Sequence, residues 1–158
     1  MSTRADPHPG CRASPLPQRR GPANPGVMTS TRHRAGARLL IVDDHAPFRT
    51  FARLLMAADG FDVVGVAVDG ADAIRATRDL RPDVVLLDVQ LPDVDGFGVA
   101  ATLVREPWVP AVVLVSSRAG ADYGRQVAAS GARGFIAKAE LSGDAVRRVL
   151  GDPERTPT

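Results

Sequence analysis

The chain has 158 residues, of which 44% are hydrophobic and 24% charged, a composition typical of one soluble globular domain. Its apolar runs are shorter than the roughly 18 residues of a membrane span, its N-terminus lacks a secretion signal, and its single cysteine, Cys11, excludes an intrachain disulfide. We therefore expect a cytoplasmic protein without membrane association, and the net charge of +2 is weak evidence for nucleic-acid binding.

The first 36 residues differ in composition from the rest of the chain. They contain six arginines, six prolines, four glycines and one acid, so the remainder carries a net negative charge. Such a segment buries too little apolar surface to offset the entropy of ordering, so we predict a disordered basic tail over residues 1–36. Its arginines lack interleaved aromatic residues, which favours solvated disorder over nucleic-acid binding. Met28 offers an alternative start.

A folded domain is predicted over residues 37–151, with a short C-terminal tail at residues 152–158. Its first strand is expected at residues 39–43, and a helix follows with Pro47 in its first turn, where a missing N–H costs little. Gly60 is a plausible end for this helix. Apolar residues recur in it at helical spacing: Phe48, Phe51, Leu54 and Leu55.

The same alternation of strand and helix patterns continues to the end of the domain. Further strands are expected at residues 62–68, 84–88, 111–116 and 134–137. Further helices are expected at residues 71–80, 97–105, 122–130 and 141–150.

Five β–α units of this length predict an α/β fold, a doubly wound parallel sheet with helices on both faces. Right-handed crossovers and a single switch point favour the flavodoxin-like strand order 2-1-3-4-5. In such sheets, ligands bind outside the carboxyl ends of the strands. The first and third strands would be neighbours, so residues that follow them should share one crevice.

Acidic residues stand at the ends of these two strands. Asp43 and Asp44 follow the first strand, and Asp88 ends the third. An isolated Asp-Asp pair would more often mark the start of a helix, where acids are favoured. Three carboxylates in one crevice instead suit Mg²⁺, a hard ion with oxygen ligands.

Two further polar residues follow strands four and five. Ser116 could simply end its strand, or its hydroxyl could donate to a phosphoryl oxygen. Lys138 is the only lysine in a chain with nineteen arginines. It could be a solvated surface charge, but it follows a strand that looks buried, where its compact ammonium could contact a phosphoryl oxygen. Asp88 could act as a nucleophile toward phosphorus. The order Asp-Asp, Asp, Ser, Lys therefore predicts a phosphoryl-transfer site.

With these residues in place, residues 38–150 resemble a response regulator receiver domain, the phosphoacceptor part of a two-component system. The resemblance is carried by VDDH at residues 42–45, LPDVDG at 91–96 and GFIAK at 134–138, which are similar to receivers of the LuxR-like class. The family implies that Asp88 accepts a phosphoryl group from a histidine kinase, a phosphotransfer protein or a small phosphodonor.

The resemblance also implies a ligand set for Mg²⁺. In it, Asp44 and Asp88 bind the ion directly, Asp43 binds it through water, and the backbone carbonyl of Gln90 completes the protein ligands.

Further roles follow from the same resemblance. Lys138 and Ser116 contact the phosphoryl oxygens, Ser116 and Phe135 form a coupled switch, and Gln90 and Arg118 tune the rate of hydrolysis. A downstream protein partner would bind the face made by the fourth helix, the fifth strand and the fifth helix, and a homodimer is a further option.

The chain departs from many receivers at several positions. Ala139 follows Lys138 where many receivers have a cis proline. Because a cis bond to a non-proline residue costs about 2.5–4 kcal/mol, a trans bond or a locally strained loop is expected. Phe135 lacks the hydroxyl of the common tyrosine. Trp108 should lie at the opposite end of strand four, far from the site. The seven residues after the last helix leave no room for a DNA-binding domain, so a stand-alone receiver or a receiver fragment of a LuxR-like regulator is expected.

Two other interpretations stay open. The segment from Asp93 to Gly96 resembles the nucleophile motif of haloacid-dehalogenase-like phosphatases, but in that superfamily the nucleophile ends the first strand. A receiver fold that serves as an interaction module without phosphorylation is the second alternative. We expect a phosphoacceptor, and not an enzyme that turns over an external substrate.

Overall fold

The computed structural model describes residues 36–118 and 123–151, in which strands and helices alternate. The strands are β1 (Arg38–Val42), β2 (Asp62–Ala67), β3 (Val84–Asp88), β4 (Ala111–Ser116) and β5 (Gly134–Ala137). The helices are α1 (Ala46–Ala58), α2 (Gly70–Leu80), α3 (Gly96–Leu103), α4 (Gly124–Ser130), the 3₁₀ helix η2 (Lys138–Glu140) and α5 (Gly143–Leu150).

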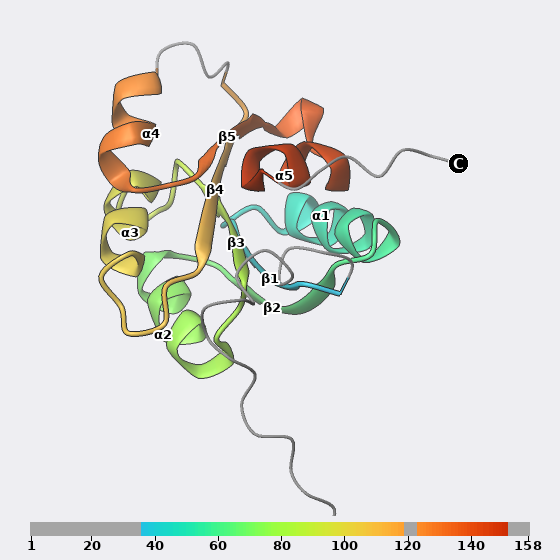
Figure 1. Ribbon diagram of the computed structural model, residues 1–158, viewed down its shortest axis with the longest axis horizontal. Helices are drawn as coiled ribbons and strands as arrows, with labels where there is room; N and C mark the ends of the chain where they lie inside the picture. The colour runs from blue at the N-terminus through green and yellow to red at the C-terminus, as the bar shows by residue number, and fades with distance from the viewer. Residues whose placement is uncertain (1–35, 119–122, 152–158) are drawn as a thin grey trace, which may run out of the picture.

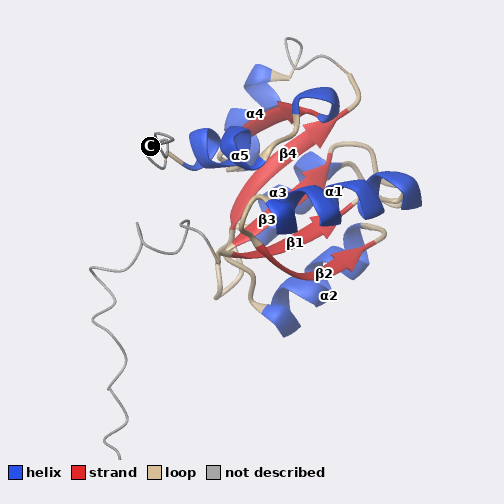
Figure 2. Cartoon of the chain, turned by 90° about the vertical axis from the view of Figure 1, so that its right-hand side faces the viewer, coloured by secondary structure: helices blue, strands red, loops and turns tan. Residues whose placement is uncertain are grey.

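The five strands form one parallel sheet in the order β2-β1-β3-β4-β5, as predicted. The strand arrows in Figure 2 accordingly point the same way. Helices α1 and α5 cover one face of the sheet, and α2, α3 and α4 cover the other (Figure 1). This is the doubly wound, flavodoxin-like arrangement in which the carboxyl ends of β1 and β3 are neighbours.

Alternating residues of the strands pack into two apolar cores, one on each face of the sheet. In β1, Leu39 and Ile41 pack beneath α1 and α5, whereas Leu40 and Val42 pack beneath the other helices. All five residues of β3 are buried because both of its faces are covered. Burying one such side chain contributes roughly 1.5–3 kcal/mol, so the two cores fix the central strands and the residues that follow them.

Side-chain caps set where three of the helices begin. Asp69, Asp95 and Ser142 each accept a hydrogen bond from the backbone N–H three residues later. The prediction that the last helix starts at residue 141 was wrong, because η2 begins at Lys138 and Ser142 then caps a helix that starts at Gly143. The third helix ends at Leu103, two residues before its predicted end. The predicted start of the fourth helix, residue 122, lies outside the described residues.

The apolar positions of α1 divide into a buried and an exposed set. Ala52 and Met56 are fully buried, and Phe48 and Leu55 pack against the same core. In contrast, Phe51 is 54% exposed and Leu54 68% exposed. Helical spacing alone therefore does not distinguish the buried apolar positions of this helix from the exposed ones.

The peptide bonds agree with the sequence predictions at the positions that the structure describes. Within the described residues no peptide bond is cis, so the bond between Lys138 and Ala139 is trans as expected. None of the described helices is long and apolar enough to cross a membrane. The predicted tails, together with Cys11 and Met28, lie outside the described residues, apart from Gly36.

Candidate functional site

The carboxyl end of the sheet gathers most of the predicted site residues. Asp43 follows β1, Asp88 ends β3, Ser116 ends β4 and Lys138 follows β5. Asp43, Asp88 and Ser116 are buried, whereas Asp44 is exposed. One oxygen from each of Asp43, Asp44 and Asp88 lies within 4.8 Å of the others. The structure therefore brings the three predicted acids together.

Asp43 has both carboxylate oxygens engaged by protein groups. Its Oδ1 accepts a hydrogen bond of 2.7 Å from the backbone N–H of His45. Its Oδ2 lies 2.5 Å from the Lys138 ammonium, an ion pair without the geometry of a directed hydrogen bond. The backbone carbonyl of Asp43 also accepts a bond of 2.8 Å from the Arg49 guanidinium. These contacts fix the turn that carries the acid pair.

Asp88 is held less tightly. Its Oδ1 accepts a bond of 3.1 Å from the backbone N–H of Gln90, and its Oδ2 lies 3.4 Å from Lys138 Nζ. Burial raises the pKa of Asp88 to about 6, and Asp43 adds to this, although the Gln90 N–H and the Lys138 ammonium oppose the rise. The carboxylate form of Asp88 is therefore costly without a further cation.

The donor set of this cluster fits a hard divalent cation. The cluster holds three carboxylates, and the Lys138 ammonium pairs with two of them, Asp43 and Asp88, so the acids outnumber this cation. Among the described residues, Asp44 makes no hydrogen bond or ion pair, so its oxygens are available as ligands. Carboxylate oxygens around a partly exposed position are the ligands that Mg²⁺ takes in proteins, where it also keeps several waters.

Lys138 has a third neighbour besides the two acids. Its ammonium lies 4.3 Å from the ring centroid of Phe48, in the first turn of α1. Its side chain is only 18% exposed, so little water reaches it. The cation is thus surrounded by two carboxylates and an aromatic ring.

Ser116 and Phe135 lie on neighbouring strands but have different surroundings. The Ser116 hydroxyl accepts a bond of 3.1 Å from the backbone N–H of Arg118, which is exposed. The partly buried Phe135 ring packs against Tyr123 at 5.5 Å between centroids, and Tyr123 packs against Phe97 at 5.5 Å. Their predicted coupling stays a prediction.

The loop after β3 is folded back toward the strand end. Gln90 forms an isolated bridge with Asp95, and Gly96 N–H donates to the Val89 carbonyl at 2.7 Å. A Cβ atom at Gly96 would overlap the Asp88 carbonyl oxygen, so this close approach requires glycine. The loop thereby places Gln90, an exposed residue, beside the acid cluster.

Asp93 serves a structural purpose elsewhere. Its carboxylate accepts bonds of 2.8 Å and 3.1 Å from the backbone N–H groups of Gly70 and Ala71, in the first turn of α2. The Gly70 bond lowers the pKa of Asp93 most, burial opposes it, and the Ala71 bond lowers the pKa further. This arrangement disfavours the phosphatase alternative, in which Asp93 would be the nucleophile.

Sequence reasoning missed the contacts that α1 makes with the site. Phe48 was predicted only as one of the apolar positions that recur along the helix, and Arg49 was not considered. The available signal was position, because a helix that starts directly after two clustered acids must bring its first turn close to them. The contact of Phe48 with a lysine 90 residues away could be found only from the folded chain.

Comparisons with known proteins agree with this geometry. A family model of the response regulator receiver domain matches residues 39–149. A protein of Pseudomonas aeruginosa named as a transcriptional regulator is 36% identical over 104 residues, which are 66% of this chain and 50% of that protein.

Two solved structures are similar to this fold. The signal receiver domain of the response regulator NarL from Mycobacterium tuberculosis has 34% identity and a TM-score of 0.65, over 73% of this chain and 94% of that chain. A two-component response regulator of the LuxR family from Aurantimonas has 26% identity and a TM-score of 0.65, over 77% and 91%. The chain spans about half the length of most of the curated relatives it matches first, and 23% of another. It belongs to the response regulator receiver domain family, the receivers of two-component systems.

Proposed function

We propose that this receiver is a phosphoacceptor switch with Asp88 as the acceptor. A carboxylate oxygen of Asp88 attacks phosphorus and forms a new P–O bond. The P–N bond of a phosphohistidine, or the acyl P–O bond of acetyl phosphate, breaks, and the departing nitrogen or oxygen keeps its electron pair. The observation that carries the proposal is a buried carboxylate beside two other acids and a single ammonium.

We propose Mg²⁺ as the cation of this site. Asp44 and Asp88 are its direct ligands, with the Gln90 backbone carbonyl. Asp43 acts through water, because both of its oxygens already face protein donors. The ion supplies positive charge that offsets the three carboxylates and the incoming phosphoryl group.

The remaining residues bind the phosphoryl group, transmit its presence to the surface or set its rate of hydrolysis. Lys138 and Ser116 contact its oxygens, and Ser116 couples to Phe135. Gln90 and Arg118, at the exposed rim, tune its hydrolysis. Receiver domains are generally not multiple-turnover enzymes, and this one acts once per phosphoryl group received.

The partners are proposed from the same mechanism. The phosphodonor is a histidine kinase or a phosphotransfer protein, and this receiver acts in the cytoplasm. Phosphorylation shifts a two-state equilibrium on the face made by α4, β5 and α5, which binds a downstream protein or a second copy of the chain.

Intact mass after incubation with acetyl phosphate tests the proposal. The wild type should gain about one phosphoryl group with Mg²⁺ present, and Asp88→Asn should gain none. Asp93→Asn is the matched control, because it makes the same change in the neighbouring loop and should still be phosphorylated. No gain in folded wild-type protein would instead support a phosphorylation-independent interaction module.

A further inference from the structure

We propose that Phe48 is a positioning residue for Lys138, whose ring holds the ammonium at the acid cluster without neutralising it. The inference rests on the proposed function, because it concerns how the phosphoryl-binding cation is placed. Phe48 itself touches neither the acids nor the incoming phosphoryl group in this account. It acts through Lys138.

The geometry is that of a cation–π contact within an ion-pair cluster. Lys138 Nζ lies 4.3 Å from the Phe48 ring centroid, well inside the roughly 6 Å over which a ring attracts a cation. The same atom lies 2.5 Å from Asp43 Oδ2 and 3.4 Å from Asp88 Oδ2. Three groups from three elements of the fold therefore fix the position of one flexible side chain.

Lys138 needs such support because of its place in the chain. It is the first residue of η2, a three-residue turn directly after β5, and its ammonium sits at the end of a flexible four-carbon stem. Without the ring, the ammonium would have one side free to turn toward water. The residual exposure of 18% indicates that Phe48 and the acids leave little room for this motion.

Phe48 is itself firmly placed. It follows Pro47 in the first turn of α1 and packs against the core beneath α1 and α5. Arg49, the next residue, ties the same turn to the carbonyl of Asp43 at 2.8 Å. The ring and the acid that share the ammonium are therefore anchored to one strand end.

An aromatic ring does something here that another acid could not. Each carboxylate brings a full negative charge, and the site already has three. A ring attracts the cation through its quadrupole and adds no net charge, so the positive charge of Lys138 stays available for phosphoryl oxygens. The contact thus favours the phosphorylated state over a static ion-pair cluster.

The test compares Phe48→Leu with Phe48→Tyr in the full chain, with Phe51→Leu as the matched control. Phe51 is one turn further along α1, with its ring centroid 6.3 Å from that of Phe48, and is more than half exposed. We expect Phe48→Leu to slow phosphorylation by acetyl phosphate about three- to thirtyfold, the range of a partly desolvated cation–π contact. Phe48→Tyr and Phe51→Leu should stay close to wild type.

A second readout reports the position of Lys138 without any phosphoryl transfer. Because Lys138 is the only lysine, lysine-selective isotope labelling gives one side-chain NMR signal set. Its Cε protons should be shielded by the Phe48 ring in the wild type, in Phe48→Tyr and in Phe51→Leu, and should lose this shielding in Phe48→Leu.

The outcomes separate the inference from the proposed function. A folded Phe48→Leu variant with wild-type phosphorylation and an unchanged Lys138 signal would overturn the inference. A Phe51→Leu variant that disturbs Lys138 as much as Phe48→Leu would overturn it too. If the wild type takes up no phosphoryl group, the proposed function fails, and the Lys138 signal alone then decides whether Phe48 positions it.

Discussion

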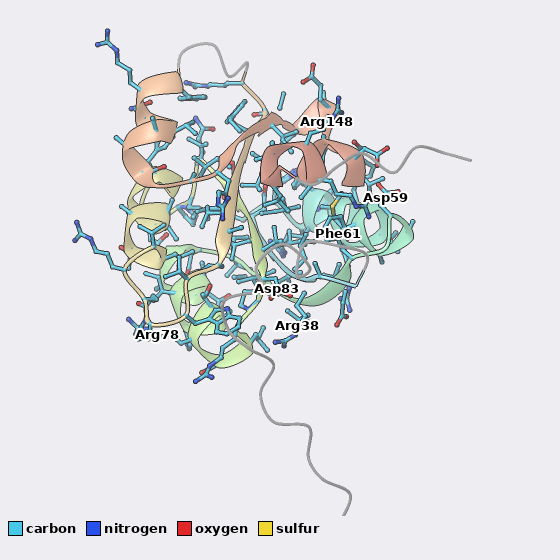
Figure 3. All side chains as sticks on the ribbon, in the orientation of Figure 1. Arg38, Asp59, Phe61, Arg78, Asp83 and Arg148 are labelled. Carbon is cyan, nitrogen blue, oxygen red and sulfur yellow. The ribbon has the colours of Figure 1, made fainter. Side chains whose placement is uncertain are left out.

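The carboxyl end of the sheet gathers three acids, two of which share one ammonium, whereas charged groups at the amino end bond to separate partners. At the amino end, the Arg38 backbone N–H donates to the Asp83 carboxylate at 2.9 Å, and the Arg38 guanidinium donates to the Arg81 carbonyl at 3.1 Å. Figure 3 shows Arg38 and Asp83 side by side at this end. These bonds join β1 to the segment before β3.

The same end has two further paired groups. Arg78, labelled in Figure 3, makes two hydrogen bonds of 3.0 Å and 2.7 Å with the Glu106 carboxylate. The Trp108 indole N–H donates to the Pro82 carbonyl at 2.8 Å. Each of these groups faces a protein partner, and the Arg78 side chain is 60% exposed.

Charges at the two ends of the sheet serve different purposes: stability at the amino end and chemistry at the carboxyl end. Paired surface groups stabilise modestly and do not need a ligand. A buried cluster of like charges lowers stability unless a ligand of opposite charge binds to it. Such clusters are typical of functional sites and not of purely structural regions. The predictions below change one end and use the other as the control.

The largest effect is expected when the single ammonium is removed. Lys138→Met leaves the buried Asp43 and Asp88 carboxylates without their cation, and should lower the free energy of unfolding by about 3 kcal/mol at neutral pH. It should also abolish phosphoryl uptake. Arg78→Met, which breaks an exposed pair at the amino end, should have far smaller effects. Guanidinium denaturation would contradict the comparison if both variants lost similar stability.

Replacing one acid should affect stability differently at the carboxyl and the amino end of the sheet. Asp88→Asn relieves a buried, crowded carboxylate and should stabilise the metal-free protein by about 1–2 kcal/mol at pH 7.5. Asp83→Asn weakens the bond to Arg38 and should be neutral or destabilising by up to about 1 kcal/mol. Urea denaturation without Mg²⁺ measures both, and a destabilised Asp88→Asn variant would count against the account.

The advantage of Asp88→Asn should depend on pH. The pKa of Asp88 is raised to about 6, first by burial and then by Asp43, above the 3.8 of an unperturbed side chain. The folded protein therefore binds a proton at Asp88 more tightly than the unfolded chain does. Protonation of Asp88 should thus raise the free energy of unfolding of the wild type as the pH falls from about 6 toward 4. Relative to the wild type, the variant's gain should shrink through that window and vanish near pH 4. A constant difference from pH 7.5 to 4 is the contrary result.

The smallest effect is expected for the fluorescence of Trp108 when a ligand is added to the site. Its indole is bonded to Pro82 at the amino end of the sheet, away from the acid cluster. Adding Mg²⁺ or acetyl phosphate should leave its fluorescence essentially unchanged. A large change on Mg²⁺ addition would show that the two ends are coupled more strongly than their separation suggests.

Much of this fold could be predicted because its signals are local. Continuous apolar runs such as Val84–Leu87 mark strands buried on both faces, and the sheet order follows from handedness and a single switch point. The acid cluster could be predicted too, since β1 and β3 are neighbours in that order and each ends in acids.

What could not be predicted depends on contacts between distant segments. The exposure of Phe51 and Leu54 depends on which face of α1 the sheet covers, and helical spacing alone does not fix that face. The cap that Asp93 provides for α2, and the Phe48 ring over Lys138, join residues about 20 and 90 positions apart. The helix α5 starts two residues later than predicted because the short helix η2, which begins at Lys138, precedes it.

The central claim is that Asp88, among several clustered acids, receives the phosphoryl group. Borohydride reduces an acyl phosphate to an alcohol, so treating phosphorylated protein with borohydride and sequencing its peptides by mass spectrometry locates the acceptor. We predict homoserine at position 88 and unchanged aspartate at positions 43, 44 and 93. Homoserine at any of those other positions, with Asp88 intact, would contradict the account.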